Sequence, residues 1–258
     1  MNSESLIHRD AKIAKNVEIG PFCVIGKNVI IGENCKIHSH VVIEGDVSIG
    51  KNVEIFPFAS IGKIPQDLKY KGENTKVIIG EDCKIREYVT INLGTAGGGG
   101  ITKIGNNCLL MVGTHVAHDC LVGNNVIFAN HSTLAGHVII ENNVVVGALS
   151  AIHQFSRVGE GSMIGGMSGV TADVIPFSTV MGNRAKLCGL NLVGLKRNKY
   201  DKDEINELRR TFKYIFYSKK NTLEFRKNKI QKENLKFYTI GKILNFLDSE
   251  TRRSLCMP

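Results

Sequence analysis

The sequence predicts an all-β solenoid of short parallel strands followed by a small α-helical domain. Three observations lead to this fold class. Aliphatic residues recur at every sixth position over most of residues 1–185, and a small residue lies two positions before each of them. Glycine often follows the aliphatic residue directly. Beyond residue 185 this period is lost, and apolar residues recur at helical spacing instead.

The repeats come in three runs. Isoleucine fills every sixth position from Ile7 to Ile61, a second run starts at Ile79, and a third extends from Ile104 to Val170. Two inward residues separated by one outward residue form a short strand, because side chains alternate between faces. Three strands joined by turns close a triangular coil of 18 residues, and stacked coils pair their strands in parallel. An amphipathic helix or a coiled coil does not accommodate a period of six.

The repeat also predicts where most cysteines lie. The small inward position is occupied by Cys23, Cys35, Cys83, Cys108 and Cys120. We expect these thiols to be buried as small apolar groups, which excludes Cys120 as a nucleophile. The absence of paired CxxC spacings among seven cysteines favours a reducing compartment, so we expect a cytoplasmic protein. We expect neither a signal peptide nor a transmembrane segment.

Two excursions interrupt the repeats, at residues 62–78 and 92–103. The first spans 18 positions between aliphatic residues, and we expect it to replace one coil. The second contains a run of glycines but no Gly-Lys-Ser/Thr, so it is not a phosphate-binding P-loop. We expect a mobile external loop there, of the kind on which rigid scaffolds carry binding residues.

Residues 1–185 form the predicted solenoid domain and residues 186–258 the helical domain. Asp201 to Glu204 resembles a capping box ahead of a helix. The solenoid has a net charge of −1, and residues 186–258 have a net charge of +10. This distribution argues against a nucleic-acid-binding surface along the whole chain and leaves a local basic surface.

Histidines converge at one corner of the predicted solenoid. With 18 residues per coil, His118, Gly136 and Gln154 stack on one another, and His115, His137 and His153 lie beside them. Two interpretations compete: a metal site, or a general base with accessory imidazoles. Asp119 could orient His118, and the N–H of Gly136 could bind a developing oxyanion, which together suggest acyl transfer. No exposed Ser or Cys lies credibly beside the base, which favours direct attack by an acceptor hydroxyl.

Seven motifs resemble the bacterial UDP-N-acetylglucosamine O-acyltransferase family: QDLKY (66–70), THVAHDC (114–120), LAGH (134–137), HQF (153–155), GGMSG (165–169), GNRA (182–185) and NLVGLKR (191–197). The resemblance implies a left-handed parallel β-helix of hexapeptide repeats and a homotrimer. It further implies transfer of a 3-hydroxyacyl group from acyl carrier protein to the 3-hydroxyl of UDP-N-acetylglucosamine, the first step of lipid A biosynthesis. We expect no cofactor, no metal and no nucleic acid.

The resemblance also implies roles for individual residues. His118 is the expected general base, supported by Asp119, with the backbone of Gly136 as the oxyanion hole. The glucosamine and acyl portions are assigned to Asp67, Lys69, His115 and His137, and Gln66 is expected to bind substrate as well. The nucleotide is assigned to His153, Gln154, Asn191 and Arg197, and acyl-chain length to Gly166, where a glycine leaves room for a longer chain. The sequence departs from the family pattern at Val193, Asn198 and Arg184.

Three alternatives remain open from the sequence. The first is a zinc metalloenzyme similar to γ-class carbonic anhydrase, and the second is a non-catalytic trimeric scaffold. The third is the related N-acyltransferase of the same pathway. That family has an extra domain before its repeats, whereas the repeats here begin by Ile7.

Overall fold

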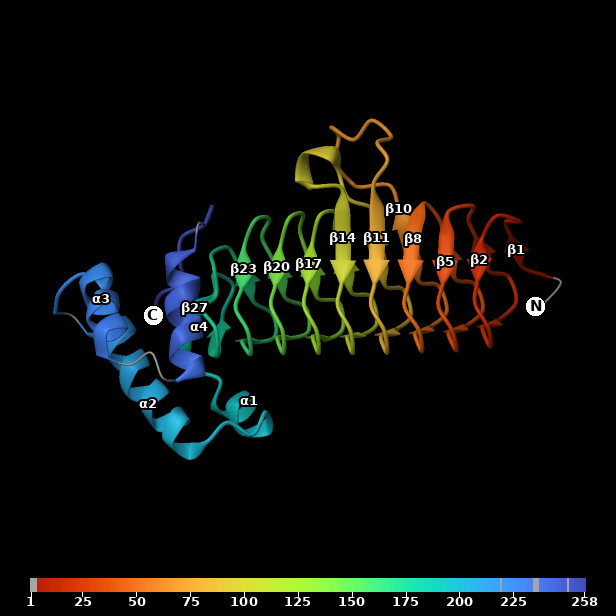
Figure 1. The fold of residues 1–258 in the computed structure, drawn as a ribbon. Coiled ribbons are helices and arrows are strands. Elements are labelled where there is room, and N and C mark those ends of the chain that lie inside the picture. The colour runs from red at the N-terminus through yellow and green to blue at the C-terminus, as the bar shows by residue number, and fades with distance from the viewer. Residues whose placement is uncertain (1–3, 219, 234–236, 250) are drawn as a thin grey trace.

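The computed structural model describes residues 4–218, 220–233, 237–249 and 251–258. The chain forms a left-handed parallel β-helix with a helical region packed at its C-terminal end (Figure 1). Within the described residues, the strands form three sheets of nine, eight and ten strands, here called sheets A, B and C. The predicted fold class is confirmed.

Each of the coils from β1 to β24 contributes one strand to each sheet. Sheet A consists of β1 (Leu6–Ile7), β4 (Val24–Ile25), β7 (Val42–Ile43), β10 (Ser60–Lys63), β13 (Thr90–Asn92), β16 (His115–Val116), β19 (Thr133–Leu134), β22 (Ala151–Ile152) and β25 (Gly169–Val170). Sheet B consists of β2 (Lys12–Ile13), β5 (Val29–Ile31), β8 (Asp46–Ile49), β11 (Lys76–Ile79), β14 (Ile101–Ile104), β17 (Leu121–Val122), β20 (Ile139–Ile140) and β23 (Arg157–Val158). Sheet C consists of β3 (Glu18–Ile19), β6 (Lys36–Ile37), β9 (Glu54–Ile55), β12 (Lys84–Ile85), β15 (Leu109–Leu110), β18 (Ile127–Phe128), β21 (Val145–Val146), β24 (Met163–Ile164), β26 (Ser178–Met181) and β27 (Lys186–Leu190).

The core is a continuous aliphatic column inside the three sheets. Its inward positions are the periodic residues of the sequence, and side chains such as Ile43 and Val116 are completely buried. The five cysteines predicted at inward positions are also buried, Cys120 among them, and burial raises its pKa to about 12. A thiol with such a pKa stays protonated at neutral pH, so Cys120 is a packing residue.

The two excursions lie at one corner of the β-helix, between sheets A and B. β10 in sheet A leads through the first excursion to β11 in sheet B, and β13 leads through the second to β14. Ile79 pairs with Ile49 and Ile104, whereas Ile61 pairs with Ile43 and Ile91. The expectation that residues 62–78 replace a coil is therefore wrong, because they lengthen a single turn. The two excursions project together from the A/B corner (Figure 1).

The C-terminal region begins with a hairpin, because β27 pairs antiparallel with β26. The helices follow from Leu192, six residues beyond the expected start of the helical domain: α1 (Leu192–Arg197), α2 (Lys202–Phe212), the π-helix η2 (Lys213–Tyr217), α3 (Leu223–Glu233) and α4 (Tyr238–Asp248). None of the described helices is long and apolar enough to cross a membrane.

The start of α2 differs from the expected capping box. Asp201 is the N-cap residue, but its side chain makes no capping hydrogen bond. Glu204 instead accepts a hydrogen bond from the backbone N–H of Thr239 at 2.9 Å. The glutamate therefore accepts from a backbone N–H in the first turn of α4 that has no partner within its own helix, and this bond links α2 to α4.

Candidate active site

The histidines predicted to converge do so at the A/B corner, on three neighbouring coils. His115 lies in β16 and is paired in register with Thr133 of the next coil, so His118 lies directly below Gly136. The backbone N–H of His137 donates to the carbonyl of His118 at 3.0 Å. The rings of His118 and His137 meet edge to face, with centroids 5.0 Å apart. The parallel register thus brings together side chains that are 19 positions apart.

His118 and Asp119 form a hydrogen-bonded pair. Nδ1 of His118 lies 2.8 Å from Oδ2 of Asp119, whose side chain is completely buried. A carboxylate only accepts hydrogen bonds, so the proton of a neutral His118 is on Nδ1 and its Nε2 carries the lone pair. His118 itself is 13% exposed, which leaves a narrow access to that nitrogen. This is the arrangement of a general base with an orienting acid.

The glycine-rich excursion holds Asp119 in place. The backbone N–H of Thr95 donates to Oδ1 of Asp119 at 2.9 Å, and the hydroxyl of Thr95 donates to Oδ2 at 2.6 Å. A Cβ on Gly98 would lie 2.1 Å from Cγ of Asp119, so only glycine lets the loop approach so closely. The expected mobile loop is therefore packed against the candidate base through its aspartate.

Thr95 and Thr102 are site residues that the sequence did not predict. The hydroxyl of Thr102, which is completely buried, accepts a hydrogen bond from the backbone N–H of Asp119 at 2.8 Å. Asp119 has a φ of 59°, a left-handed conformation that this bond helps to hold. The glycine run marked the segment, but nothing in the sequence showed which residue it would contact.

Gly136 lies against the imidazole of His118. A Cβ at this position would come within 2.6 Å of Nε2 of His118, so any larger residue would displace the ring. The carbonyl of Gly136 accepts a hydrogen bond from Phe155, whereas no acceptor for its N–H is found among the described residues. A free N–H beside the base could bind a developing oxyanion.

His115 and His137 flank the pair. Nδ1 of His115 lies 2.7 Å from the hydroxyl of Thr90, and burial together with the nearby His118 lowers the pKa of His115. Burial also lowers the pKa of His137, although Asp119, 3.8 Å away, acts in the opposite direction. Both imidazoles are thus held neutral, as hydrogen-bonding rather than charged groups.

These two lowered pKa values predict a loss of stability on acidification. The unfolded chain titrates near the ordinary histidine value of 6.5, so below that pH it binds protons that the folded state does not. The stability that these two histidines contribute is therefore fully present above pH 6.5 and is lost as the pH falls toward their folded pKa values. We expect a smaller fall in Tm between about pH 7.5 and about pH 5.5 for a His115→Gln/His137→Gln double variant than for the parent. An equal fall in both proteins would contradict this assignment.

The same corner also places three potential metal ligands close together. His118, Asp119 and His137 each offer a ligand atom, all within 4.8 Å of one another. However, Oδ2 of Asp119 already accepts hydrogen bonds from Thr95 and His118, and a cation there would displace both donors. The nitrogen that His118 directs at the aspartate carries a proton rather than a lone pair. The donor set thus fits a base and its orienting acid better than a metal site.

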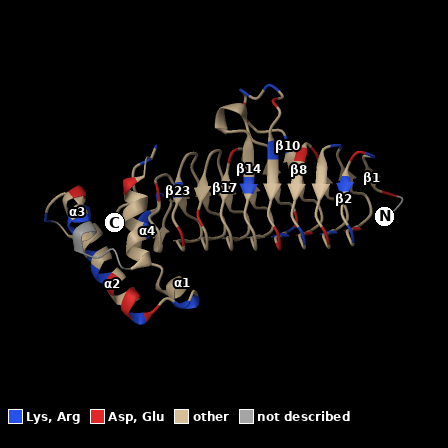
Figure 2. Ribbon diagram, viewed as in Figure 1, with Lys and Arg blue, Asp and Glu red and all other residues tan. Residues whose placement is uncertain are grey.

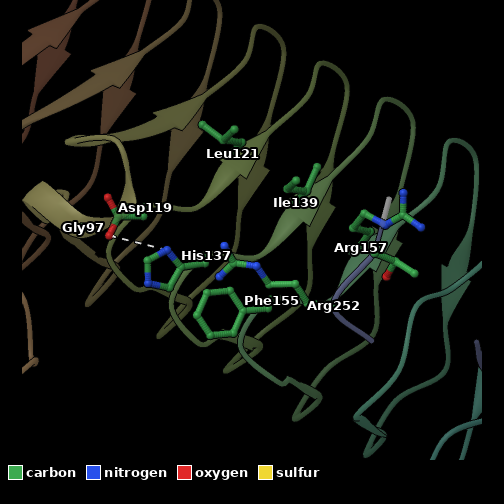
Figure 3. Close-up of a pocket in the computed structure, with 10 residues that line it drawn as sticks. Gly97, Asp119, Leu121, His137, Ile139, Phe155, Arg157 and Arg252 are labelled. Carbon is green, nitrogen blue, oxygen red and sulfur yellow. Dashed lines mark ion pairs between the residues drawn. The ribbon is translucent and has the colours of Figure 1, made fainter. Parts of the chain in front are cut away.

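A cavity of about 410 Å³ opens beside Asp119 and His137, although His118 is not among the residues that line it. Its wall combines the polar residues of the corner with Leu121, Ile139 and Phe155, which lie in succession on three coils (Figure 3). A second cavity of about 210 Å³ shares His137 and Phe155 with the first. Asp67 and Lys69 of the first excursion line this second cavity. The exposed Gln66 lines neither cavity.

The residues expected to bind nucleotide are spread more widely. Nδ1 of His153 lies 2.8 Å from Nη2 of Arg253, and the carbonyl of Gln154 accepts from Nε of the same arginine at 3.0 Å. Asn191 is the N-cap of α1, where Oδ1 accepts from Gly194 and Nδ2 donates to the carbonyl of Gly161. Arg197 ends α1.

Gly166 and α1 are not part of the cavity walls. Gly166 lies on the turn between β24 of sheet C and β25 of sheet A, which is a different corner from that of His118. Neither of the two cavities at the A/B corner is lined by Asn191, Arg197 or Gly166. A single chain therefore brings together the predicted catalytic residues, but not all of the predicted binding residues.

Comparisons with known proteins agree with this geometry. Residues 173–256 match a family model described as UDP N-acetylglucosamine O-acyltransferase, domain 2. Residues 10–45, 28–63 and 101–136 match the bacterial transferase hexapeptide model. A crystal structure of LpxA from Acinetobacter baumannii is 43% identical, covers 98% of each chain and superposes with a TM-score of 0.95. UDP-N-acetylglucosamine acyltransferase from Campylobacter jejuni is 40% identical, covers 100% of this chain and 99% of its own, and has a TM-score of 0.94.

Two curated relatives carry the name acyl-[acyl-carrier-protein]–UDP-N-acetylglucosamine O-acyltransferase. The protein from Paracoccus denitrificans is 52% identical over 57% of this chain, and the match spans 56% of that relative. The protein from Campylobacter concisus is 42% identical over 84% of this chain and 82% of its own length. The chain belongs to the UDP-N-acetylglucosamine O-acyltransferase family.

Proposed function

We propose that this protein transfers a 3-hydroxyacyl group from acyl carrier protein to the 3-hydroxyl of UDP-N-acetylglucosamine, the first step of lipid A biosynthesis. The observation that carries the proposal is the buried His118–Asp119 pair beside the N–H of Gly136. The apolar side chains of Leu121, Ile139 and Phe155 give the adjoining cavity a surface suited to an acyl chain. Family membership supports the same activity.

The proposed mechanism has no covalent enzyme intermediate. Nε2 of His118 accepts the proton of the sugar 3-hydroxyl while the hydroxyl oxygen attacks the carbonyl carbon of the thioester. The negative charge that develops on the carbonyl oxygen is bound by the N–H of Gly136, and the buried carboxylate of Asp119 stabilises the imidazolium. When the tetrahedral intermediate collapses, the C–S bond breaks and His118 returns the proton to the leaving thiolate.

The binding roles follow from position. His115 and His137 flank the base, and Asp67 and Lys69 line the adjoining cavity, which supports their contact with the sugar and acyl groups. Gln66 lines neither cavity but precedes Asp67 in the same excursion, and it is proposed to contact substrate there. His153 and Gln154 lie on the coil that follows that of Gly136 and His137, and they are proposed to contact the nucleotide.

We further propose that the enzyme is a homotrimer located in the cytoplasm. Gly166, Asn191 and Arg197 line neither cavity at the A/B corner of their own chain, so their proposed binding roles require a neighbouring subunit. Leu149 and Met167 are 60% and 75% exposed at the corner that carries Gly166, and contact with another subunit would cover them. All seven cysteines are free thiols, which supports a reducing compartment.

The direct test is incubation of the purified protein with UDP-N-acetylglucosamine and a panel of 3-hydroxyacyl carrier proteins of increasing chain length. We expect a 3-O-acylated sugar nucleotide, with the preferred chain length reporting on the space beside Gly166. Absence of sugar acylation with every donor would defeat the proposal. Loss of activity to chelators, restored by zinc, would favour a metalloenzyme instead.

The basic helical region offers a docking surface for the acidic carrier protein. Arg209, Arg210 and Lys213 are exposed on α2 and η2, and Figure 2 shows other basic residues on α1 and α2. Changing all three to glutamine is expected to raise the KM for the acyl carrier roughly tenfold at low salt and to weaken its salt dependence. The matched control changes Arg9, Lys12 and Lys27 at the far end of the β-helix. An unchanged KM in the first variant would exclude this docking site.

A further inference from the structure

The C-terminal segment, residues 251–258, returns to the β-helix and is anchored beside the candidate active site. The backbone N–H of Asp173 donates to the carbonyl of Ser254 at 2.7 Å, and the N–H of Cys256 donates to the carbonyl of Asp173 at 2.8 Å. The hydroxyl of Thr251 donates to the buried carboxylate of Asp173. Backbone and side-chain bonds therefore fix the end of the chain against the last coils.

A second set of contacts comes from Arg253. Its guanidinium contacts His153 and the carbonyl of Gln154, both at the A/B corner. Arg252 thus lies between two anchored residues, Thr251 and Arg253. Its backbone position is set by these neighbours, whatever its own side chain does.

The side chain of Arg252 lies in the active-site cavity. Its Cζ is 4.9 Å from the centroid of the Phe155 ring, a cation–π contact that holds the guanidinium in place. Arg252 lines both cavities, together with Gly97, His137 and Phe155. Figure 3 shows the guanidinium beside His137 and above Phe155. Burial lowers the pKa of His137, and the positive charge of Arg252 acts in the same direction.

Among the described residues, no carboxylate forms an ion pair with this guanidinium, although Asp119, Asp67 and Glu73 line the same cavities. Arg252 makes no hydrogen bond or ion pair in the part of the chain that the structure describes, so none of its five N–H donors is engaged by those residues. Asp119 is occupied by Thr95 and His118. In the smaller cavity, Asp67 accepts from the backbone N–H of Lys69 at 2.9 Å, and Glu73 accepts from the backbone N–H of Lys71 at 3.0 Å.

We propose that Arg252 binds a phosphate group of a substrate within this cavity. A planar guanidinium pairs with two phosphate oxygens at once, and Lys69 supplies a second cation in the same cavity. The inference rests on the proposed function, because both proposed substrates carry such a group. One is the diphosphate of UDP-N-acetylglucosamine, and the other is the phosphodiester of the carrier's phosphopantetheine arm.

The test measures KM for each substrate separately in Arg252→Gln and Arg252→Lys variants, with Arg9→Gln as the control at the other end of the molecule. We expect Arg252→Gln to raise one KM about tenfold with little change in kcat, and Arg252→Lys to recover part of the loss. A rise for UDP-N-acetylglucosamine assigns the diphosphate, and a rise for the acyl carrier assigns the phosphodiester. Unchanged KM values for both substrates would overturn the proposal.

A binding measurement separates this inference from the proposed function. Calorimetry compares UDP with uridine, and 4′-phosphopantetheine with pantetheine, on the parent protein and on Arg252→Gln. The variant should lose about tenfold affinity for one phosphorylated compound and none for its unphosphorylated partner. Equal losses for both members of each pair would contradict phosphate binding. This comparison holds even if the parent fails to acylate the sugar, a failure that would count against the proposed function alone.

Discussion

Replacing His118 by alanine is expected to lower kcat by about 10²- to 10⁴-fold while leaving the protein folded. The change removes the imidazole whose Nδ1 is paired with the buried Asp119 and whose Nε2 lies against Gly136. Without it, the acceptor hydroxyl must lose its proton to water during attack. Steady-state acyl transfer with saturating substrates measures the effect directly.

Two further measurements make this prediction specific. His8→Ala, at the exposed N-terminal end of the β-helix, is the matched control and should retain the parental rate. The KM values of His118→Ala should change much less than kcat, because the lost interaction belongs to the transition state. A variant that retains more than about a tenth of the parental kcat would rule out His118 as the general base.

The repeat alone was enough to predict the β-helix and its core. A period of six with a small inward residue leaves few packings, and the parallel register then determines which side chains stack. That is why the spacing of the repeats was sufficient to place Gly136 above His118. Within a regular stack, positions 18 apart lie together because each coil repeats the last.

The first excursion exposed the limit of this reasoning. A gap of 18 positions between Ile61 and Ile79 equals one full coil, so the period alone cannot distinguish a replaced coil from a lengthened turn. The pairing of Ile79 with Ile49 resolves the ambiguity. Both excursions consequently lie at the A/B corner, beside the histidines.

Contacts made by irregular segments were beyond prediction for a related reason. Thr95 reaches Asp119 from 24 positions away, and Arg253 reaches His153 from 100 positions away. Neither contact follows from a repeat, because each depends on the tertiary path of a loop or a chain end. The site residues that belong to the regular coils were thus predictable, whereas the residues that position them were not.

Replacing Asp119 by asparagine is expected to lower kcat roughly 100-fold or more, although the new side chain has nearly the same shape. Both carboxylate oxygens accept hydrogen bonds: Oδ1 from the N–H of Thr95, and Oδ2 from Nδ1 of His118. An amide presents a donor on one side. If its NH₂ group faces Thr95, two donors meet in a buried site; if it faces His118, the imidazole must accept, and its proton moves to Nε2.

The second orientation disables the base, since Nε2 then has no lone pair with which to take the hydroxyl proton. Nitrogen chemical shifts of His118 would report the change as a proton on Nε2 in the variant and on Nδ1 in the parent. Asp10→Asn, at an exposed aspartate near the N-terminus, is the matched control and should be silent. Parental activity together with an unchanged His118 tautomer in Asp119→Asn would show that the aspartate does not orient the base. A fall in kcat together with the tautomer change would link the buried hydrogen bond to the chemistry at Nε2.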